Sequence, residues 1–548
     1  MSDADLDRLS EEIFDWYVHE NPLFATSMGI HEFDHLLPDG RRDAQLRELA
    51  KAREALERLG GIDRKALSPG KRIDRDALRN VLRMAAFEIE ELGIWESMPQ
   101  AADSVGAALF PLFMRDFAPL PKRMEGITAR LEATPRFVLD MRTRMRTPVR
   151  LWSEIASESA TRLPGFFRVI QAAGDGALPS ADRSRLAEAV AKATEAFAAQ
   201  VRWLETDILP RSADRVGIGA TKFRKLVRIR ELGITVEAIR AVGTRYLRSS
   251  KRELARVAHE VKAGASVEEA KAIVKGDHPS AFPEALAYTA KTMEDGKRFI
   301  LANGLATIPP NEELCVIETP SFLRHVIPFA AYSSPARYDA KQQGFYMVTP
   351  VEDKPEMLRE FSYPGVRNTA VHEGYPGHHL QLTCANLNPS KARALSSAIE
   401  TIEGWAHYCE DMMKEAGFSA DPSTKLVQIL DQIWRACRIV IDIDLHCGRM
   451  TFDEAVDMLV REVGMERPGA VAEVRRYTYT PAYPLSYLLG KDMILRLRRE
   501  VRRSLGKAYS DKFFHDTFLY AGSIPMTYMR QIFAYKVKEL QKLRRKGL

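Results

Sequence analysis

Cysteine is scarce in this chain of 548 residues, and its few cysteines form no disulfide framework. The five that are present are odd in number and irregularly spaced: Cys315, Cys384, Cys409, Cys437 and Cys447. This pattern is typical of reduced, mostly buried thiols. It argues against a disulfide-stapled secreted domain and against a cysteine-type zinc site.

Long apolar runs are missing as well. No run of about 18 apolar residues, the length needed to cross a membrane, is present. Residues 1–7 are acidic and lack the basic and apolar regions of a signal peptide. The chain also has no evident repeat and no long Ser/Gly/Pro linker. The sequence therefore predicts a cytoplasmic protein with no membrane partner.

A strong excess of one charge is also absent. The net charge of +6 comes from 80 basic and 74 acidic residues. Basic residues cluster at 222–230 and 542–546, but no nucleic-acid-binding motif or base-stacking aromatics accompany them. We interpret both clusters as solvated surface and expect no nucleic-acid partner. The sequence gives no sign of an oligomeric state.

Helical periodicity is abundant. Apolar residues recur at three- and four-residue spacing in windows such as 179–206, 236–263, 283–302 and 487–505. With 45% hydrophobic and 28% charged residues, the chain can bury a sizeable core. We predict a mainly α, single helical body over residues 1–548, with two lobes around a cleft. The N-terminal lobe would run to about residue 300, and the catalytic lobe would start at about 301.

Short strands are predicted in one region only. Residues 313–318 and 344–348 are β-branched or aromatic and are bounded by Pro or Gly, and residues 329–335 lie between them. Together they predict a small antiparallel sheet beside the helix that carries the motif described next. An edge strand of this sheet would align an extended peptide by backbone hydrogen bonds.

The richest group of reactive side chains is the segment Val-His-Glu-Gly-Tyr-Pro-Gly-His-His at residues 371–379. Its His372-Glu373 pair resembles the start of the H-E-x-x-H zinc motif. In that motif two histidines four residues apart share a helix face, and the glutamate is the general base. Here Pro376 occupies the position of the second histidine.

The Pro376-Gly377 pair therefore decides which histidine joins His372. On a regular helix His378 would lie roughly 120° around from His372, and His379 would lie about 10 Å further along the axis. Proline followed by glycine predicts a bulge or a break in the helix. A bulge that absorbs two residues would return His378 to the second-ligand position. His379 would need three absorbed residues and is the weaker candidate.

A zinc site needs a third protein ligand, and residues 397–410 offer several. Glu400, Glu403, His407 and Glu410 form one polar stripe on an otherwise apolar helix. Glu403 follows the motif at a distance that allows a turn and a returning helix, and His407 is the alternative ligand. Alone, such a stripe is most often a solvated face. The apolar flanks of the motif change this reading, because buried imidazoles need partners such as a metal.

These segments resemble the bacterial domain of unknown function 885 family, whose members are taken to be zinc-peptidase-like. Further matching stretches lie at residues 21–29, 344–346, 476–477 and 486–490. The family is similar, more distantly, to gluzincin peptidases such as the thermostable carboxypeptidases and oligopeptidases. The resemblance implies one Zn²⁺ per chain, bound by His372, His378 and Glu403, with Glu373 as the general base. The sequence departs from the peptidase motif at Pro376-Gly377, and from the family's usual Pro-Gly-Gln at residues 481–483.

Two further segments are candidates for stabilising the oxyanion or binding substrate. Arg438, Asp442 and His446 recur every four residues, so Asp442 either orients a catalytic His446 or belongs to an ion-pair ladder. The family carries a similar stretch, which favours a catalytic His446. In the tyrosine-rich segment 475–487, Tyr487 is the first choice for the oxyanion, and Arg476 for a substrate carboxylate.

The sequence thus predicts a zinc-dependent hydrolase that cleaves short peptides with a metal-activated water molecule. One alternative is a zinc amidase acting on a non-peptide amide. The other is a non-catalytic helical protein that keeps zinc for structure.

Overall fold

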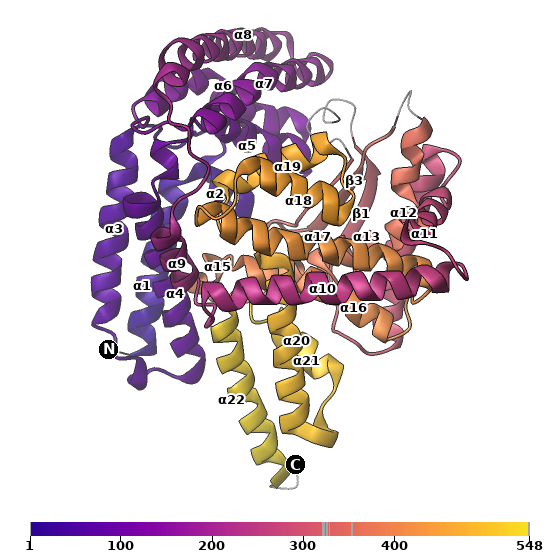
Figure 1. Cartoon of the computed structure of the whole chain (residues 1–548). Coiled ribbons are helices and arrows are strands. Elements are labelled where there is room, and N and C mark those ends of the chain that lie inside the picture. Colours follow the sequence, from indigo (N-terminus) through magenta and orange to yellow (C-terminus); the bar gives the residue numbers. More distant parts are fainter. Residues whose placement is uncertain (1, 320–323, 325–326, 328, 352–354, 546–548) are drawn as a thin grey trace. The chain divides into compact units, whose positions relative to one another are not determined.

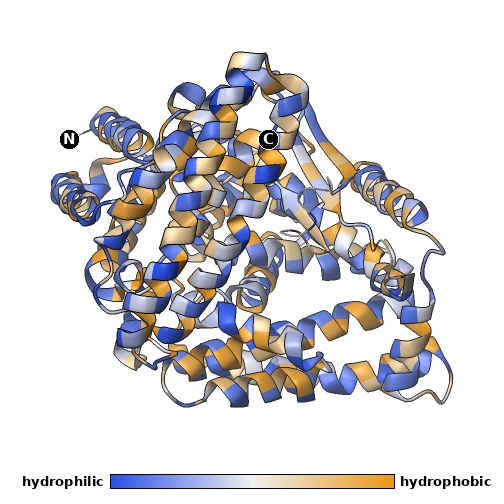
Figure 2. Cartoon of the chain, turned by 90° about the horizontal axis from the view of Figure 1, so that it is seen from above, coloured by the Kyte–Doolittle hydropathy of each residue, from blue (hydrophilic) through white to orange (hydrophobic). Residues whose placement is uncertain are grey.

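The computed structural model describes residues 2–319, 324, 327, 329–351 and 355–545. Across these residues it contains 22 α-helices and three strands, which confirms the predicted mainly α fold. Figure 2 shows hydrophilic and hydrophobic residues alternating along the helices, as expected where each helix buries one face. No helix in the described residues is long and apolar enough to cross a membrane.

The chain divides into two compact units, each assembled from three separate segments. The first unit contains Met1–Ala66, Val81–Val216 and Ala336–Lys341. The second contains Leu67–Asn80, Gly217–Pro335 and Gln342–Leu548. All the candidate site residues belong to the second unit.

The first unit contains helices and, among its described residues, no β-strand. Within it α6, α7 and α8 pack against one another (Figure 1), around buried aromatic side chains such as Trp152, Phe167 and Phe197. Its helices are α1 (Asp3–Glu20), α2 (Pro22–Met28), α3 (Arg42–Gly60), α5 (Ala101–Met114), α6 (Leu120–Arg142), α7 (Arg150–Ala177) and α8 (Ser180–Trp203). Helix α4 (Pro69–Phe87) begins in the second unit and ends in the first.

The second unit combines the remaining helices with the sheet. Long helices pair within it: α10 runs along α17 (Figure 1), and α16 packs on α20. The helices are α9 (Ala220–Ile229), α10 (Val236–Val261), α11 (Val267–Gly276), α12 (Phe282–Ala302), α13 (Tyr363–Glu373), α14 (His378–Asn386), α15 (Lys391–Ala394), α16 (Ile399–Glu415), α17 (Pro422–His446), α18 (Phe452–Val463), α19 (Arg467–Tyr479), α20 (Ser486–Leu505), α21 (Asp511–Leu519) and α22 (Met526–Arg545).

The predicted sheet forms, but it is mixed where a purely antiparallel sheet was expected. Its strands are β1 (Glu312–Glu318), β2 (Ala330–Ser333) and β3 (Gln342–Val348), in the order β1-β3-β2. The short β2–β3 connection makes that pair antiparallel, whereas β1 pairs with the other edge of β3 in parallel. Propensity located the three strands, but it did not indicate their relative directions.

The four windows chosen by helical periodicity all form helices. Residues 179–206 correspond to α8, 236–263 to α10, 283–302 to α12 and 487–505 to α20, with ends that differ by no more than a few residues. Long amphipathic segments are therefore well specified by local pattern in this chain.

Candidate metal centre

The helix that carries the His-Glu motif breaks at the predicted position. Helix α13 ends at Glu373 and α14 begins at His378, so the Pro-Gly pair lies between two helices. A Cβ atom on Gly377 would lie 1.8 Å from the carbonyl oxygen of His372, so only glycine fits there. This tight turn brings the start of α14 back beside the end of α13.

Helix α16 supplies the carboxylate from a closely packed position. At its contact with α20, a Cβ on Gly404 would lie 2.5 Å from the Gly490 backbone, and one on Gly490 would lie 2.1 Å from the Glu400 carbonyl oxygen. The two helices can approach this closely only because both positions lack side chains. The contact fixes the position of Glu403, the residue before Gly404.

His372, His378 and Glu403 come together as a group able to bind a metal ion. One ligand atom from each lies within 4.8 Å of the others. The two imidazole centroids are 4.9 Å apart with nearly perpendicular planes, and His378 Nε2 lies 3.4 Å from Glu403 Oε2. All three residues are buried. The structure thus brings together the three residues expected as ligands.

His372 is oriented by a buried carboxylate behind it. Its Nδ1 lies 2.8 Å from Glu410 Oε1, so Nε2 is the nitrogen that can bind a metal. The amide of Asn368 donates to the other Glu410 oxygen over 3.3 Å. Burial would raise the pKa of Glu410, but the charge of His407 and the hydrogen bond to His372 hold it well below its usual range. Glu410 therefore acts as an anionic partner that fixes the His372 ring.

Glu403 is held in its charged form. Burial would raise its pKa, but the hydrogen bond and charge of His378, the charge of His372 and a hydrogen bond from Tyr483 lower it to about 2. The Tyr483 hydroxyl donates to Glu403 Oε1 over 2.8 Å. Tyr483 was not predicted as a site residue from the sequence. The only sequence signal for it was that it is one of the four tyrosines in segment 475–487.

The donor set suits zinc. Two imidazole nitrogens and one carboxylate oxygen are the ligands of many catalytic zinc sites, and a buried carboxylate behind one histidine is a frequent support. The Nδ1 atom of His378 is buried without a hydrogen-bond partner. Three protein ligands leave a coordination position for water or substrate.

The two alternative histidines have other environments. His379 is fully buried, with Nδ1 3.0 Å from the Tyr332 hydroxyl and Nε2 2.6 Å from Glu312 Oε2, so both ring nitrogens are engaged. His407 Nδ1 lies 3.2 Å from Glu410 Oε1, and burial lowers the His407 pKa to about 4. In the described residues, neither ring belongs to the three-residue group.

Glu373 and Tyr487, expected as base and oxyanion donor, interact electrostatically with this group. Glu373 is the half-buried last residue of α13 and directly follows His372. Burial lowers the His372 pKa, but the hydrogen bond to Glu410 and the charge of Glu373 raise it. The ring of Tyr487 lies 5.9 Å from that of Tyr483. Burial and the charge of Glu403 raise the Tyr487 pKa. Both side chains thus lie within electrostatic range of a candidate ligand.

His446 occupies a different environment from the one expected of a catalytic histidine. It is fully buried, stacks on Phe223 and has its Nε2 3.0 Å from the Tyr477 carbonyl oxygen. Asp442 lies 3.6 Å from the ring, too far to orient it by a hydrogen bond. Asp442 instead accepts hydrogen bonds from the backbone N–H groups of Ala482 and Leu485. Its observed contacts support the turn that carries Tyr483.

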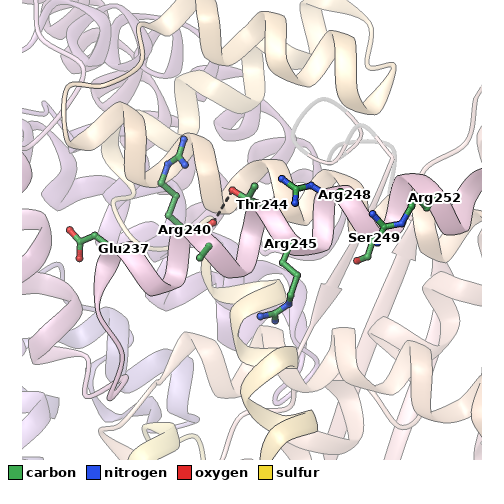
Figure 3. Close-up of a pocket in the computed structure, with 8 residues that line it drawn as sticks. Glu237, Arg240, Thr244, Arg245, Arg248, Ser249 and Arg252 are labelled. Carbon is green, nitrogen blue, oxygen red and sulfur yellow. Dashed lines mark hydrogen bonds between the residues drawn. The ribbon is translucent and has the colours of Figure 1, made fainter.

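A pocket of about 640 Å³ lies along α10 and is lined by arginines (Figure 3). Two of these arginines form ion pairs, Arg240 with Asp444 and Arg245 with Asp492. None of the candidate site residues lines this pocket. It is therefore separate from the candidate metal centre.

Comparison with known proteins identifies a family but no activity. The model of a family described as "Bacterial protein of unknown function (DUF885)" matches residues 22–532. No curated protein matches the chain significantly. A solved structure of a candidate lipoprotein of unknown function from Shewanella oneidensis has a TM-score of 0.80 at 23% identity, covering 96% of this chain and 99% of that one. One of a candidate lipoprotein from Colwellia psychrerythraea has a TM-score of 0.83 at 18% identity, covering 98% and 99%. At these identities the likeness shows a shared fold.

Proposed function

The chain belongs to the DUF885 family of bacterial proteins of unknown function, and we propose that it is a zinc-dependent hydrolase that cleaves peptide bonds of short peptides. The observation that carries the proposal is the buried group of His372, His378 and Glu403 at the helix break. Two neutral nitrogen donors and one carboxylate leave a single positive charge on a bound divalent cation. That charge favours binding of a hydroxide or a polarised carbonyl.

Zinc, when bound, supplies a Lewis acid that polarises the scissile carbonyl and makes water easier to deprotonate. The protein's own residues would do the rest. The Glu373 carboxylate accepts the proton of the attacking water and returns it to the leaving amine as the carbon–nitrogen bond breaks. The Tyr487 hydroxyl donates a hydrogen bond to the oxygen that gains negative charge.

The support behind the ligands favours a site built for chemistry. Glu410 holds the His372 ring through Nδ1, and the Tyr483 hydroxyl holds Glu403 through Oε1. Such contacts limit the motion of ligands and raise the basicity of a bound imidazole. The half-buried Glu373 next to them is the feature that a purely structural zinc site would not need.

The substitution Glu373→Gln tests the proposal, because it keeps the side-chain shape and removes the base. We expect purified protein to contain zinc, to cleave a library of short peptides and to lose activity on chelation. Glu373→Gln should retain zinc and lose at least about 100-fold in kcat. Glu195→Gln, at an exposed position on α8, is the control and should behave as wild type. If the protein cleaves no peptide, or if Glu373→Gln cleaves peptides as wild type does, the peptidase proposal is wrong. Cleavage of non-peptide amides alone would support the amidase alternative.

A further inference from the structure

We propose that the substrate of this site carries a carboxylate, which Arg476 binds while Arg438 reinforces the positive charge behind it. The inference deepens the proposed peptidase function and rests on it. It names the chemical class of the substrate: short peptides with a carboxylate near the cleaved bond.

Arg438 is a fixed, buried cation. Its side chain is 5% exposed, and its guanidinium lies between two aromatic rings, 4.1 Å from the Trp434 centroid and 4.8 Å from that of Tyr487. Its Nε donates to the Tyr477 hydroxyl over 2.8 Å, and Nη2 donates to Glu473 over 3.0 Å. With these contacts the side chain has little freedom to move toward a substrate. It sets the local charge.

One carboxylate is shared by two arginines. Glu473 Oε2 accepts from Arg438 at 3.0 Å, from Arg476 at 3.1 Å and from the Tyr477 hydroxyl at 2.6 Å. Two guanidinium groups thus face one carboxylate, which leaves one positive charge in excess. Arg476 is the accessible member, since its side chain is 36% exposed. Its planar fork can bind a second carboxylate through two parallel N–H donors.

Two tyrosines connect the excess charge to the candidate metal centre. The Tyr487 ring is 5.9 Å from the Tyr483 ring, and the Tyr483 hydroxyl is bonded to Glu403. The charges of Glu403, Arg438 and Arg476 all act on the Tyr487 phenol, so both arginines lie within electrostatic range of it. A peptide extends by about 3.5 Å per residue. We place the substrate carboxylate in one of the few residues beyond the cleaved bond.

Three peptides that share the same cleavable bond test this inference on the zinc-loaded, full-length protein. One has a free C-terminus and neutral side chains, one is amidated and neutral, and one is amidated with a glutamate as its last residue. We expect at least one carboxylate-bearing peptide to exceed the neutral amide by about 10- to 100-fold in kcat/KM. The better of the two identifies the terminus or the side chain as the source of the carboxylate.

Variants at Arg476 assign the effect to this residue. Arg476→Gln should remove most of the preference, chiefly by raising KM for the carboxylate-bearing peptides, and Arg476→Lys should restore part of it. The control is Arg461→Gln on α18, where the side chain is 66% exposed and contacts Glu462. It should keep the full preference. Zinc content and melting temperature show whether each variant is folded, and if Arg476→Gln is not, Arg476→Lys decides.

Equal kcat/KM for the three peptides would overturn the inference and leave the peptidase function standing. An undiminished preference in folded Arg476→Gln would overturn the role of Arg476. Failure to cleave any peptide would overturn the inference together with the function on which it rests.

Discussion

The indole Nε1 of Trp405 donates a hydrogen bond to the carbonyl oxygen of Pro376 over 2.7 Å, which ties the middle of α16 to the break between α13 and α14. Both groups are buried, and the Trp405 side chain is completely enclosed. Glu403 lies on α16, His372 on α13 and His378 at the start of α14, so this bond links the helix of Glu403 to the break between the helices of the two histidines. The geometry of the candidate metal site therefore depends on a contact that involves none of the candidate ligands.

Replacing Trp405 with phenylalanine should weaken both the fold and the site. The Pro376 carbonyl would be left buried without a donor, which should lower the free energy of unfolding by about 1–3 kcal/mol. Zinc affinity should fall as the break loosens. Denaturant unfolding and zinc titration measure the two effects. Trp95→Phe, which removes an indole bond to the Ile89 carbonyl in the first unit, should cost stability without changing zinc affinity. Unchanged zinc affinity in Trp405→Phe would contradict the link.

The glycine contact between α16 and α20 should tolerate no side chain. A methyl group on Gly404 would meet the Gly490 backbone at 2.5 Å, so Gly404→Ala must push the helices apart. We expect Gly404→Ala to lose at least about 3 kcal/mol of stability, since backbone cannot move aside as a flexible side chain can. Gly176→Ala in α7 is the matched control. Its Cβ would meet no atom within 4 Å, so it should be neutral or up to about 1 kcal/mol more stable. Thermal unfolding distinguishes the two, and equal effects would refute the packing argument.

Substitutions of the neighbouring residues His378 and His379 should show which of the two histidines binds the metal. His378→Ala should abolish stoichiometric zinc binding, because it removes one of three ligands. His379→Gln should retain zinc, because both ring nitrogens of His379 are already engaged by Tyr332 and Glu312. Metal analysis after dialysis measures the difference, and both variants should lose some stability. The opposite pattern would show that His379 is the ligand.

A histidine of the first unit should make stability depend on pH. The His31 ring stacks on Phe117, with Nδ1 2.8 Å from Asp34 and Nε2 3.0 Å from Asp339. Burial would lower the His31 pKa, but the hydrogen bonds and charges of Asp339 and Asp34 raise it to about 9. Because the folded pKa exceeds the unfolded value of about 6.5, the protonated ring contributes stability that is complete below pH 6.5. That contribution falls as the pH rises through about 9.

Denaturant unfolding between pH 6 and pH 10 tests this dependence. We expect a loss of about 1–3 kcal/mol across that range in wild type, and a smaller loss in His31→Gln. Parallel curves for the two proteins would show that His31 does not bind its proton more tightly in the folded state.

Local pattern specified much of this fold, but it did not specify contacts between distant segments. Helices α8, α10, α12 and α20 follow from periodicity, and the break between α13 and α14 follows from the Pro-Gly pair. The parallel pairing of β1 with β3 does not follow, because strand propensity carries no information about direction. We predicted the grouping of His372 and His378 with Glu403 from the residue spacing and the family resemblance together.

The residues that surround the candidate ligands could not be predicted from local sequence pattern. Tyr483 reaches Glu403 from a turn far along the chain, and no periodicity connects the two residues. The spacing of Asp442 and His446 correctly put them on one helix face, but it could not show what packs there. Phe223 from α9 covers His446, and the turn before α20 engages Asp442. Only tertiary packing separates these supporting roles from a catalytic one.

The interleaving of the two units has a consequence for dissecting the protein. The chain passes from one unit to the other after residues 66, 80, 216, 335 and 341, so neither unit is a continuous stretch of sequence. Arg393 of the second unit binds Asp74, which lies in the early segment 67–80. Any single truncation that isolates the second unit also removes that segment or leaves part of the first unit attached. Ribosomal synthesis must therefore pass residue 341 before the first unit has all of its parts, and it must continue well beyond that residue before the second unit does.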